Sequence, residues 1–406
     1  MYIARHLESS VLARAKEKGA IVVTGARQVG KTTLVGRIKP DIPWITFDDL
    51  SIRNRAVNDP AAFFELNPPP AFIDEVQYAP EVFPYIKISL DRSHRKGDFF
   101  LTGSQSYALM ENVTESLAGR AGILTLLGLS LREIKNETWN EPFLPTLDYL
   151  LRRKEGRVSL SAKEVWEIIH RGSMPELCAQ KDFNWRNFYG DYVKTYIERD
   201  VRQLTQVADE GQFLKFMTVC AAMTGSLLNL ASMSRDVGIS EPTAKRWLSI
   251  LQTGGIVYLL KPYANNAIKR AVKTPKLYFL DTGLAAYLTR WLTPETLSEG
   301  AMNGHFFETL VVAELLKSYT NAGLEEDFYF LRDGNGREVD LLLYQDNTLF
   351  PLEIKLHTSP TPKDIKGFSA LEGLPGVNIG EGGVICLAQE LLPLADKHRI
   401  IPLWAL

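Results

Sequence analysis

The chain has 406 residues and a formal net charge of -2, with 45% hydrophobic and 23% charged residues. These are values of a globular protein of two to three domains, and they exclude a largely disordered or collagen-like chain. The three cysteines, Cys178, Cys220 and Cys386, form no CxxC pair, which argues against a disulfide framework and a cysteine zinc site. We see neither a secretory leader nor an apolar run of about 18 residues that could span a membrane, so we expect a cytoplasmic protein.

The first 140 residues alternate between short apolar runs and helix-length segments. Such runs are typical of a parallel sheet that is buried on both faces. The sequence therefore predicts an α/β domain at residues 1–140, with strands at 21–24, 44–47, 71–73, 99–102 and 123–127.

The remaining chain is expected to form three further parts. Residues 141–210 are predicted to be a helical connector, with helices over 162–170 and 185–205. Residues 211–292 are predicted to hold helices over 230–237 and 241–252, the second with Ser240 as N-cap and Pro242 in its first turn, followed by a strand at 256–260. Residues 293–406 return to an α/β pattern, with a long amphipathic helix over 303–318 and strands at 327–331, 338–344 and 350–355.

A phosphate-binding motif, G-x-x-x-x-G-K-[ST], lies between the first predicted strand and the next helix, which is the context it requires. Backbone N–H groups of such a loop and the helix N-terminus can cradle a phosphate. Lys31 would reach the β- and γ-phosphates, and the Thr32 hydroxyl would bind Mg²⁺. We therefore expect ATP and Mg²⁺ as cofactors, with these binding residues: Gly25, Ala26, Arg27, Gln28, Val29, Gly30, Lys31, Thr32 and Thr33.

Acidic and polar residues follow two later strands of the same domain. Asp74 and Glu75 end the third strand, where Asp74 would hold Mg²⁺ and Glu75 would polarise the attacking water. Ser104 and Gln105 end the fourth strand and could lie between this pair and the γ-phosphate; a simple turn is the alternative.

These motifs resemble those of AAA+-type P-loop ATPases. The segments GARQVGKTTL, FIDEVQ, LTGSQS, ESLAGR and YIERDV are more closely similar to a prokaryotic family that joins such an ATPase to a C-terminal domain of restriction-endonuclease-like fold. The resemblance covers nearly the whole chain. It implies that Asp74 and Glu75 are the Walker B pair, that Ser104 or Gln105 is the sensor, and that Arg120 or Arg199 meets the γ-phosphate. An arginine acting in trans would imply a homo-oligomer, and either arginine could instead form an ordinary ion pair.

The segment 231–260 fits a helix-turn-helix followed by a strand, as in a winged helix. The helix beginning after Ser240 carries Lys245 and Arg246 opposite an apolar face, in the place of a recognition helix. Between Arg235 and Lys276 there are eight basic and two acidic residues, a local excess that suits DNA. Docking to a protein or to another domain is the alternative.

Carboxylates of the C-terminal part form the pattern D…ExK, with Asp340, Glu353 and Lys355. Glu353 and Lys355 point to one face of a strand, and Asp340 on the neighbouring strand could reach the same place. The pattern resembles the PD-(D/E)xK nuclease core, in which Asp340, Glu353 and Glu308 would bind Mg²⁺ or Mn²⁺ and Lys355 would orient water. A non-cleaving DNA-binding domain and a structural Glu–Lys ion pair are the alternatives.

The sequence thus predicts a Mg²⁺-dependent ATPase that acts on DNA or is regulated by it, with a nuclease-like C-terminal domain. The rival hypothesis is a regulatory ATPase switch whose C-terminal domains bind a protein partner and cleave nothing.

Overall fold

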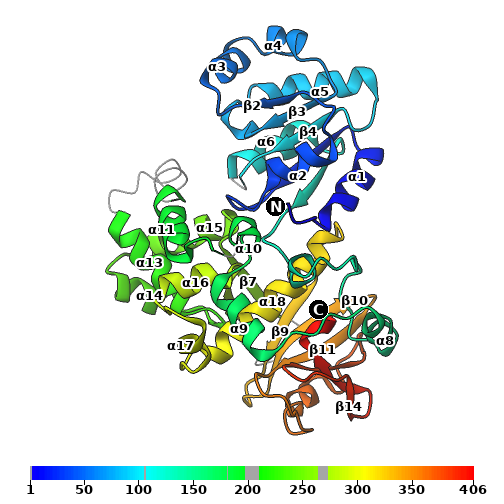
Figure 1. Cartoon of the computed structure of the whole chain (residues 1–406), viewed down its shortest axis with the longest axis vertical. Helices are drawn as coiled ribbons and strands as arrows, with labels where there is room; N and C mark the ends of the chain where they lie inside the picture. The colour runs from blue at the N-terminus through cyan, green and yellow to red at the C-terminus, as the bar shows by residue number, and fades with distance from the viewer. Residues whose placement is uncertain (1, 105–106, 181, 197–209, 264–272) are drawn as a thin grey trace.

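The structure, a computed structural model, describes residues 2–104, 107–180, 182–196, 210–263 and 273–406. Figure 1 shows the N-terminal sheet with its helices at the top, a group of helices at the left and the C-terminal sheet at the lower right. Among the described residues, no helix is long and apolar enough to cross a membrane.

The N-terminal domain contains a five-stranded parallel sheet of order β2-β3-β4-β1-β5. All five predicted strands are present, with bounds that differ from the prediction by no more than two residues. Ile21 and Val23 pack on one face of the sheet, and Ala20 and Val22 on the other, as a strand buried on both faces requires. The strands are β1 (Ala20–Thr24), β2 (Trp44–Thr46), β3 (Ala71–Asp74), β4 (Phe99–Thr102) and β5 (Ala121–Thr125).

Helices cover both faces of this sheet. α1 (Leu7–Glu17) and α2 (Lys31–Ile38) pack on one face, and α3 to α6 pack on the other. The first helix was not predicted, although its buried residues Leu7, Val11 and Ala15 recur every four positions. The helices on the other face are α3 (Leu50–Asn58), α4 (Pro60–Leu66), α5 (Val82–Ser93) and α6 (Tyr107–Leu117), with the short η1 (Val76–Tyr78) after β3.

A helical connector follows the N-terminal domain. A capping box of Ser161 and Glu164 begins α9 (Ala162–Arg171), which confirms the helix predicted there. The helix predicted over 185–205 is described as α11 (Trp185–Tyr196), and the rest of that range lies outside the described residues. The connector also contains α8 (Leu147–Glu155) and α10 (Pro175–Ala179), and the short α7 (Leu131–Ile134) precedes it.

The middle of the chain has the order helix, strand, two helices and two strands. The Ser240 side chain accepts a hydrogen bond from the Thr243 amide, so the predicted N-cap is confirmed. Trp247 packs between the rings of Phe213 and Phe216, at 5.2 and 5.7 Å between centroids. The elements are α13 (Glu210–Ala222), β6 (Ser226–Leu227), α14 (Leu230–Val237), α15 (Glu241–Thr253), β7 (Val257–Pro262) and β8 (Lys276–Phe279).

The C-terminal sheet is continuous with the strands of the middle segment. It has the order β14-β15-β13-β11-β10-β9-β7-β8-β6, and β7 pairs with β9 in parallel, so it crosses the domain boundary expected at residue 292. The strands beyond residue 300 are β9 (Phe328–Arg332), β10 (Glu338–Gln345), β11 (Thr348–Ile354), β12 (Asn378–Ile379), β13 (Gly382–Cys386), β14 (Leu392–Ala395) and β15 (His398–Pro402). The helices after β8 are α16 (Thr282–Leu288), α17 (Pro294–Ser298), α18 (Asn303–Asn321), η3 (Lys366–Leu371) and η4 (Leu403–Ala405).

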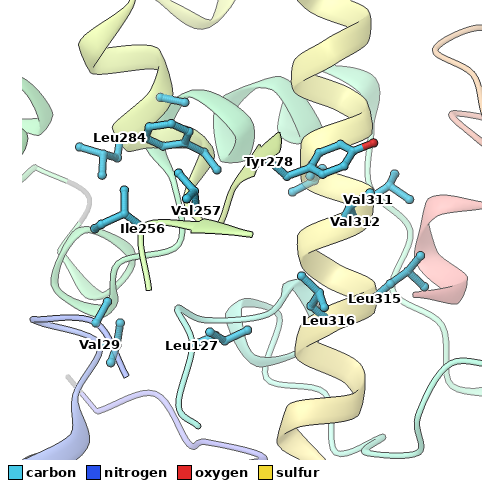
Figure 2. Packing of buried hydrophobic residues seen from close by; sticks show 14 of the residues in the cluster. Val29, Leu127, Ile256, Val257, Tyr278, Leu284, Val311, Val312, Leu315 and Leu316 are labelled. Carbon is cyan, nitrogen blue, oxygen red and sulfur yellow. The ribbon is translucent and has the colours of Figure 1, made fainter. Parts of the chain in front are cut away.

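Helix α18 lies in the main hydrophobic core of the molecule. The prediction of an amphipathic helix was wrong, because its residues are buried almost all round, including Glu314 and Lys317. Figure 2 shows Leu315 and Leu316 of this helix with Leu127 of the N-terminal part and Val257 of β7, all members of one cluster. A single core therefore joins the three regions of Figure 1.

Candidate functional site

The predicted phosphate-binding loop lies between β1 and α2 and has the backbone that such a loop needs. Gly25 has φ +147°, and a Cβ there would lie 2.1 Å from the carbonyl oxygen of Leu126. Gly30 has φ 93° and forms the N-cap of α2 without a side-chain cap. Both positions therefore favour glycine, and the second of them directly precedes the N-terminus of α2, where a phosphate can bind.

Lys31 points back into the loop. Its ammonium donates to the carbonyl oxygens of Gly25 at 3.1 Å and Ala26 at 2.8 Å, and the residue is only 7% exposed. A lysine in this position places a positive charge inside the curl of the loop, where phosphate oxygens would bind.

Thr32 and Asp74, the predicted Mg²⁺ ligands, are in contact. The Thr32 hydroxyl donates to Asp74 Oδ1 at 2.9 Å, and the Thr102 hydroxyl donates to the same oxygen. A hydroxyl and a carboxylate oxygen side by side fit the ligands that Mg²⁺ prefers next to a phosphate. The residues present therefore fit the cofactors that the motif implies.

Glu75 lies next to this pair in a constrained conformation. Its φ of 56° is rare for a residue with a side chain, and such strain is found most often at functional sites. The side chain of Gln77 donates to the Glu75 carboxylate and also to the Ser104 hydroxyl, at 3.2 Å for the latter. The structure thus brings Ser104 to Glu75 through Gln77, a residue that the sequence reasoning did not select.

A pocket of about 750 Å³ opens over the loop. Its lining contains Glu75 and every loop residue from Arg27 to Thr33, and it also contains groups from outside the motif. Tyr2 and Ile3 come from the N-terminus, and Pro175 and Glu176 come from α10. No motif marked these residues, since only the tertiary fold brings them to the loop.

Of the two predicted arginines, only Arg120 lies within the described residues, and it does not line this pocket. Arg120 immediately precedes β5 and so lies at the N-terminal ends of the parallel strands, whereas the loop follows the C-terminal end of β1. There Arg120 pairs with Asp91 at 2.5 Å on the surface. The structure therefore does not bring Arg120 to the nucleotide site of its own chain. Arg199 and Gln105 lie outside the described residues.

The predicted C-terminal site residues also come together. Lys355 Nζ lies 2.7 Å from Glu353 Oε2 and 3.2 Å from Asp340 Oδ2, and Glu308 of α18 lies on the other side of Asp340. The sequence reasoning missed Lys276 of β8, whose ammonium lies 3.2 Å from Glu308 Oε1 and 3.8 Å from Asp340 Oδ1.

Glu338 and Tyr278 complete this cluster. Glu338 Oε1 lies 2.7 Å from Lys276 Nζ, and the Tyr278 hydroxyl donates to Glu308 Oε1 at 2.5 Å. We name these residues the carboxylate cluster: Lys276, Tyr278, Glu308, Glu338, Asp340, Glu353 and Lys355. The sequence places Lys276 among the basic residues expected to contact DNA, but in the structure it is only 5% exposed and is therefore not available at the surface.

Burial and mutual contact set the ionisation of the cluster. Burial and the neighbouring Asp340 raise the pKa of Glu353 to about 9. Burial also raises the pKa of Glu308. The pKa of Asp340 is lowered although burial opposes this, because Lys276 and Lys355 stabilise its charged form. Burial and like charge therefore favour the protonated form of Glu353 and Glu308, whereas the two lysines favour the ionised form of Asp340.

Comparison with known proteins divides the chain into three parts. The family model described as AAA domain matches residues 17–135. This segment, which contains the phosphate-binding loop, is therefore similar to an AAA domain. Models of two domains of unknown function, DUF8612 and DUF4143, match residues 162–295 and 303–406.

Relatives of similar length have no recorded function. An uncharacterized protein of Mycobacterium tuberculosis is 26% identical over 404 residues, which is 99% of this chain and 84% of the relative. One of Methanocaldococcus jannaschii is 22% identical, covering 94% and 87%. Among solved structures, a Walker-type ATPase of Pyrococcus abyssi is 16% identical, with a TM-score of 0.43 over 71% of this chain and 96% of that one.

Arg5 fixes the loop of the AAA-type domain to the rest of the molecule. Its guanidinium donates to the carbonyl oxygen of Val29 at 2.8 Å and to that of Leu127 at 2.7 Å, and it pairs with Glu133 at 3.1 Å. Both charged groups are almost completely buried. Burial opposes ionisation of Glu133, but Arg5 and the amides of Ser130 and His6 outweigh it and lower the pKa of this carboxyl.

We expect Arg5→Ala to lower the free energy of unfolding by about 3–5 kcal/mol, because it leaves Glu133 charged and buried without its partner. Arg14→Ala is the matched control: Arg14 pairs with Glu17 on the surface of α1, and its loss should cost less than about 1 kcal/mol. Urea unfolding of both variants measures the difference. Equal losses would contradict a special role for Arg5.

Proposed function

We propose that the chain binds ATP with Mg²⁺ and hydrolyses it in the AAA-type domain. The observation that carries this proposal is the contact of Thr32 with Asp74 beside the inward-pointing Lys31, in a loop with positive φ at both glycines. Loop amides and Lys31 would bind the phosphates, while Thr32 and Asp74 would hold Mg²⁺, which neutralises phosphate charge when bound.

Glu75 is the group that we assign to the attacking water. Its carboxylate lies at the pocket and can accept a proton from water or orient it. Gln77 is a positioning residue in this proposal, since it joins the Glu75 carboxylate to Ser104 at the end of β4. Ser104 would thereby sense the γ-phosphate indirectly.

Lys31→Ala should weaken ATP binding at least tenfold, since it removes the charge-assisted contact to the phosphates. Isothermal titration calorimetry with a non-hydrolysable ATP analogue measures the affinity. Lys87→Ala, which removes an exposed lysine of α5, is the control and should bind like the wild type. An unchanged affinity in Lys31→Ala would refute the assignment of this loop.

Glu75→Gln should retain ATP but lower the rate of phosphate release by about 10²-fold or more, because an amide cannot act as a base. The control is Glu81→Gln, an exposed change after η1 that should leave turnover unchanged. Turnover within about threefold of wild type would show that Glu75 is not the catalytic carboxylate, since a general base contributes at least ~10²-fold.

For the middle segment, we propose a winged helix that contacts DNA. The order of α13, β6, α14, α15, β7 and β8 is the one this fold uses, and the antiparallel pair β7–β8 would be the wing. Trp247 and Leu248 of α15 are buried, while Lys245 and Arg246 on the same helix are exposed. The described basic residues that remain exposed around this helix are Arg235, Lys245, Arg246, Lys261 and Lys273; Lys269 and Arg270 lie outside the described residues.

Lys245→Ala combined with Arg246→Ala should lower DNA affinity and reduce the slope of log K against log salt by about 2, one for each lost phosphate contact. Lys16→Ala with Lys163→Ala removes two exposed charges from α1 and α9 and is the control. Fluorescence anisotropy with duplex DNA, with and without ATP, gives both slopes. A wild-type slope in the α15 variant would favour the rival proposal, a regulatory switch whose middle segment docks onto a protein.

Two further proposals extend this function. Arg120 is at the surface, so it could reach the nucleotide site of another copy in a homo-oligomer of a cytoplasmic protein. DNA cleavage by Asp340, Glu353 and Lys355 with Mg²⁺ or Mn²⁺ remains a prediction from the sequence pattern, with non-cleaving DNA binding as its alternative.

A further inference from the structure

Lys276 occupies the inner side of the carboxylate cluster. Its ammonium lies 2.7 Å from Glu338 Oε1, 3.2 Å from Glu308 Oε1 and 3.8 Å from Asp340 Oδ1. The ring centroid of Phe330 lies 5.5 Å from the same nitrogen. Three carboxylates and an aromatic face thus surround one buried ammonium, which is the environment that a cation requires away from water.

Both oxygen atoms of Asp340 and one of Glu308, which a metal ion would need, already have partners. Asp340 Oδ1 faces Lys276, while Asp340 Oδ2 accepts from Lys355 Nζ at 3.2 Å and from the Ile354 amide at 2.9 Å. Glu308 Oε1 accepts from both Lys276 and Tyr278. Within the described part of the chain, no group of three or more His, Cys, Asp or Glu residues is arranged to hold a metal ion.

An ammonium and a divalent cation at the same carboxylate oxygens would repel each other at short range. Mg²⁺ requires near-octahedral oxygen ligands at about 2.0–2.1 Å. Lys276 would have to withdraw to allow this, which would place its charge unpaired in the core at a large cost in free energy. The residues present therefore do not fit the metal shell of Glu308, Asp340 and Glu353 that the sequence predicts.

We propose that the ammonium of Lys276 is the permanent cation of the carboxylate cluster and takes the place of a divalent ion. Lys276 comes from β8, whereas Glu308 lies on α18 and Glu338 and Asp340 lie on β10. Lys276 therefore also links the strand pair β7–β8 of the middle segment to α18 and β10 through ion pairs. The ion pairs of the cluster hold the middle segment against the C-terminal sheet without a metal ion.

The experiment compares wild type with Lys276→Met, both in an Asp74→Asn background that removes the carboxylate proposed to hold Mg²⁺ at the nucleotide site. Electron paramagnetic resonance counts bound Mn²⁺, and thermal melting is recorded with and without Mn²⁺. The wild-type cluster should bind no Mn²⁺. Lys276→Met should melt at a lower temperature, should bind one Mn²⁺, and should recover several degrees when the ion is present, because ligand binding to the folded state stabilises it.

Lys261→Met is the matched control, since Lys261 is an exposed lysine on β7 in the same strand pair. It should neither lower the melting temperature measurably nor create a Mn²⁺ site. If Lys276→Met fails to fold, the double variant Lys276→Met/Glu308→Gln removes one charge of each sign and should fold. The double variant should then show a melting transition, which Lys276→Met lacks, at a temperature below that of wild type.

Three results would overturn the proposal. The first is wild-type Mn²⁺ binding that Glu353→Gln abolishes, which would show a working metal site. The second is a folded Lys276→Met variant that gains no Mn²⁺ site. The third is a double variant that is no more stable than Lys276→Met alone, which would show that Lys276 and Glu308 are not coupled.

Discussion

A buried polar junction in the segment between β5 and α8 links the N-terminal domain to α18. Arg5 and Glu133 form an ion pair there, and Lys317 of α18 donates to the carbonyl oxygen of Leu129 at 2.9 Å while pairing with Glu314 at 2.8 Å. Glu314 in turn accepts from the Leu131 amide at 2.7 Å. Since each of these charges is almost completely buried, each must keep its partner, and the segment that follows β5 cannot move independently of α18.

The buried ion pair of Arg5 also affects the surroundings of the nucleotide site. The phosphate-binding loop is local in sequence, but its Val29 carbonyl is held by Arg5, and residues of α10 line the pocket above it. Arg5 also donates to the Leu127 carbonyl, and Lys317 of α18 donates to the Leu129 carbonyl in the same segment, so buried hydrogen bonds connect the loop with α18. Glu308 lies about two turns before Glu314 and Lys317 on the same helix. One rigid element thus touches both the AAA-type domain and the carboxylate cluster.

Charge is shared between segments in the same way at the other end of α18. Four carboxylates from α18, β10 and β11 meet two lysines, and Lys276 is supplied by β8 of the middle segment. The basic residues between positions 235 and 276 therefore fall into two groups, one exposed and one buried. Lys245 and Arg246 remain exposed on α15, whereas Lys276 is buried and paired with carboxylates. A count of charges along the sequence cannot make this distinction, because burial depends on strand pairing.

The sequence by itself determined the features that depend on neighbouring residues. Apolar runs located the five strands of the N-terminal sheet, Ser240 located the start of α15, and the glycine motif located Lys31 and Thr32 next to Asp74. Only the tertiary structure decided which distant groups meet. No periodicity or motif points to Arg5 at Val29 or to Lys276 among the carboxylates. Gln77 lies in the segment FIDEVQ, but that segment does not show that its side chain joins Glu75 to Ser104. Their positions follow from a single core around α18, because a buried charge is stable only where the fold supplies its partner.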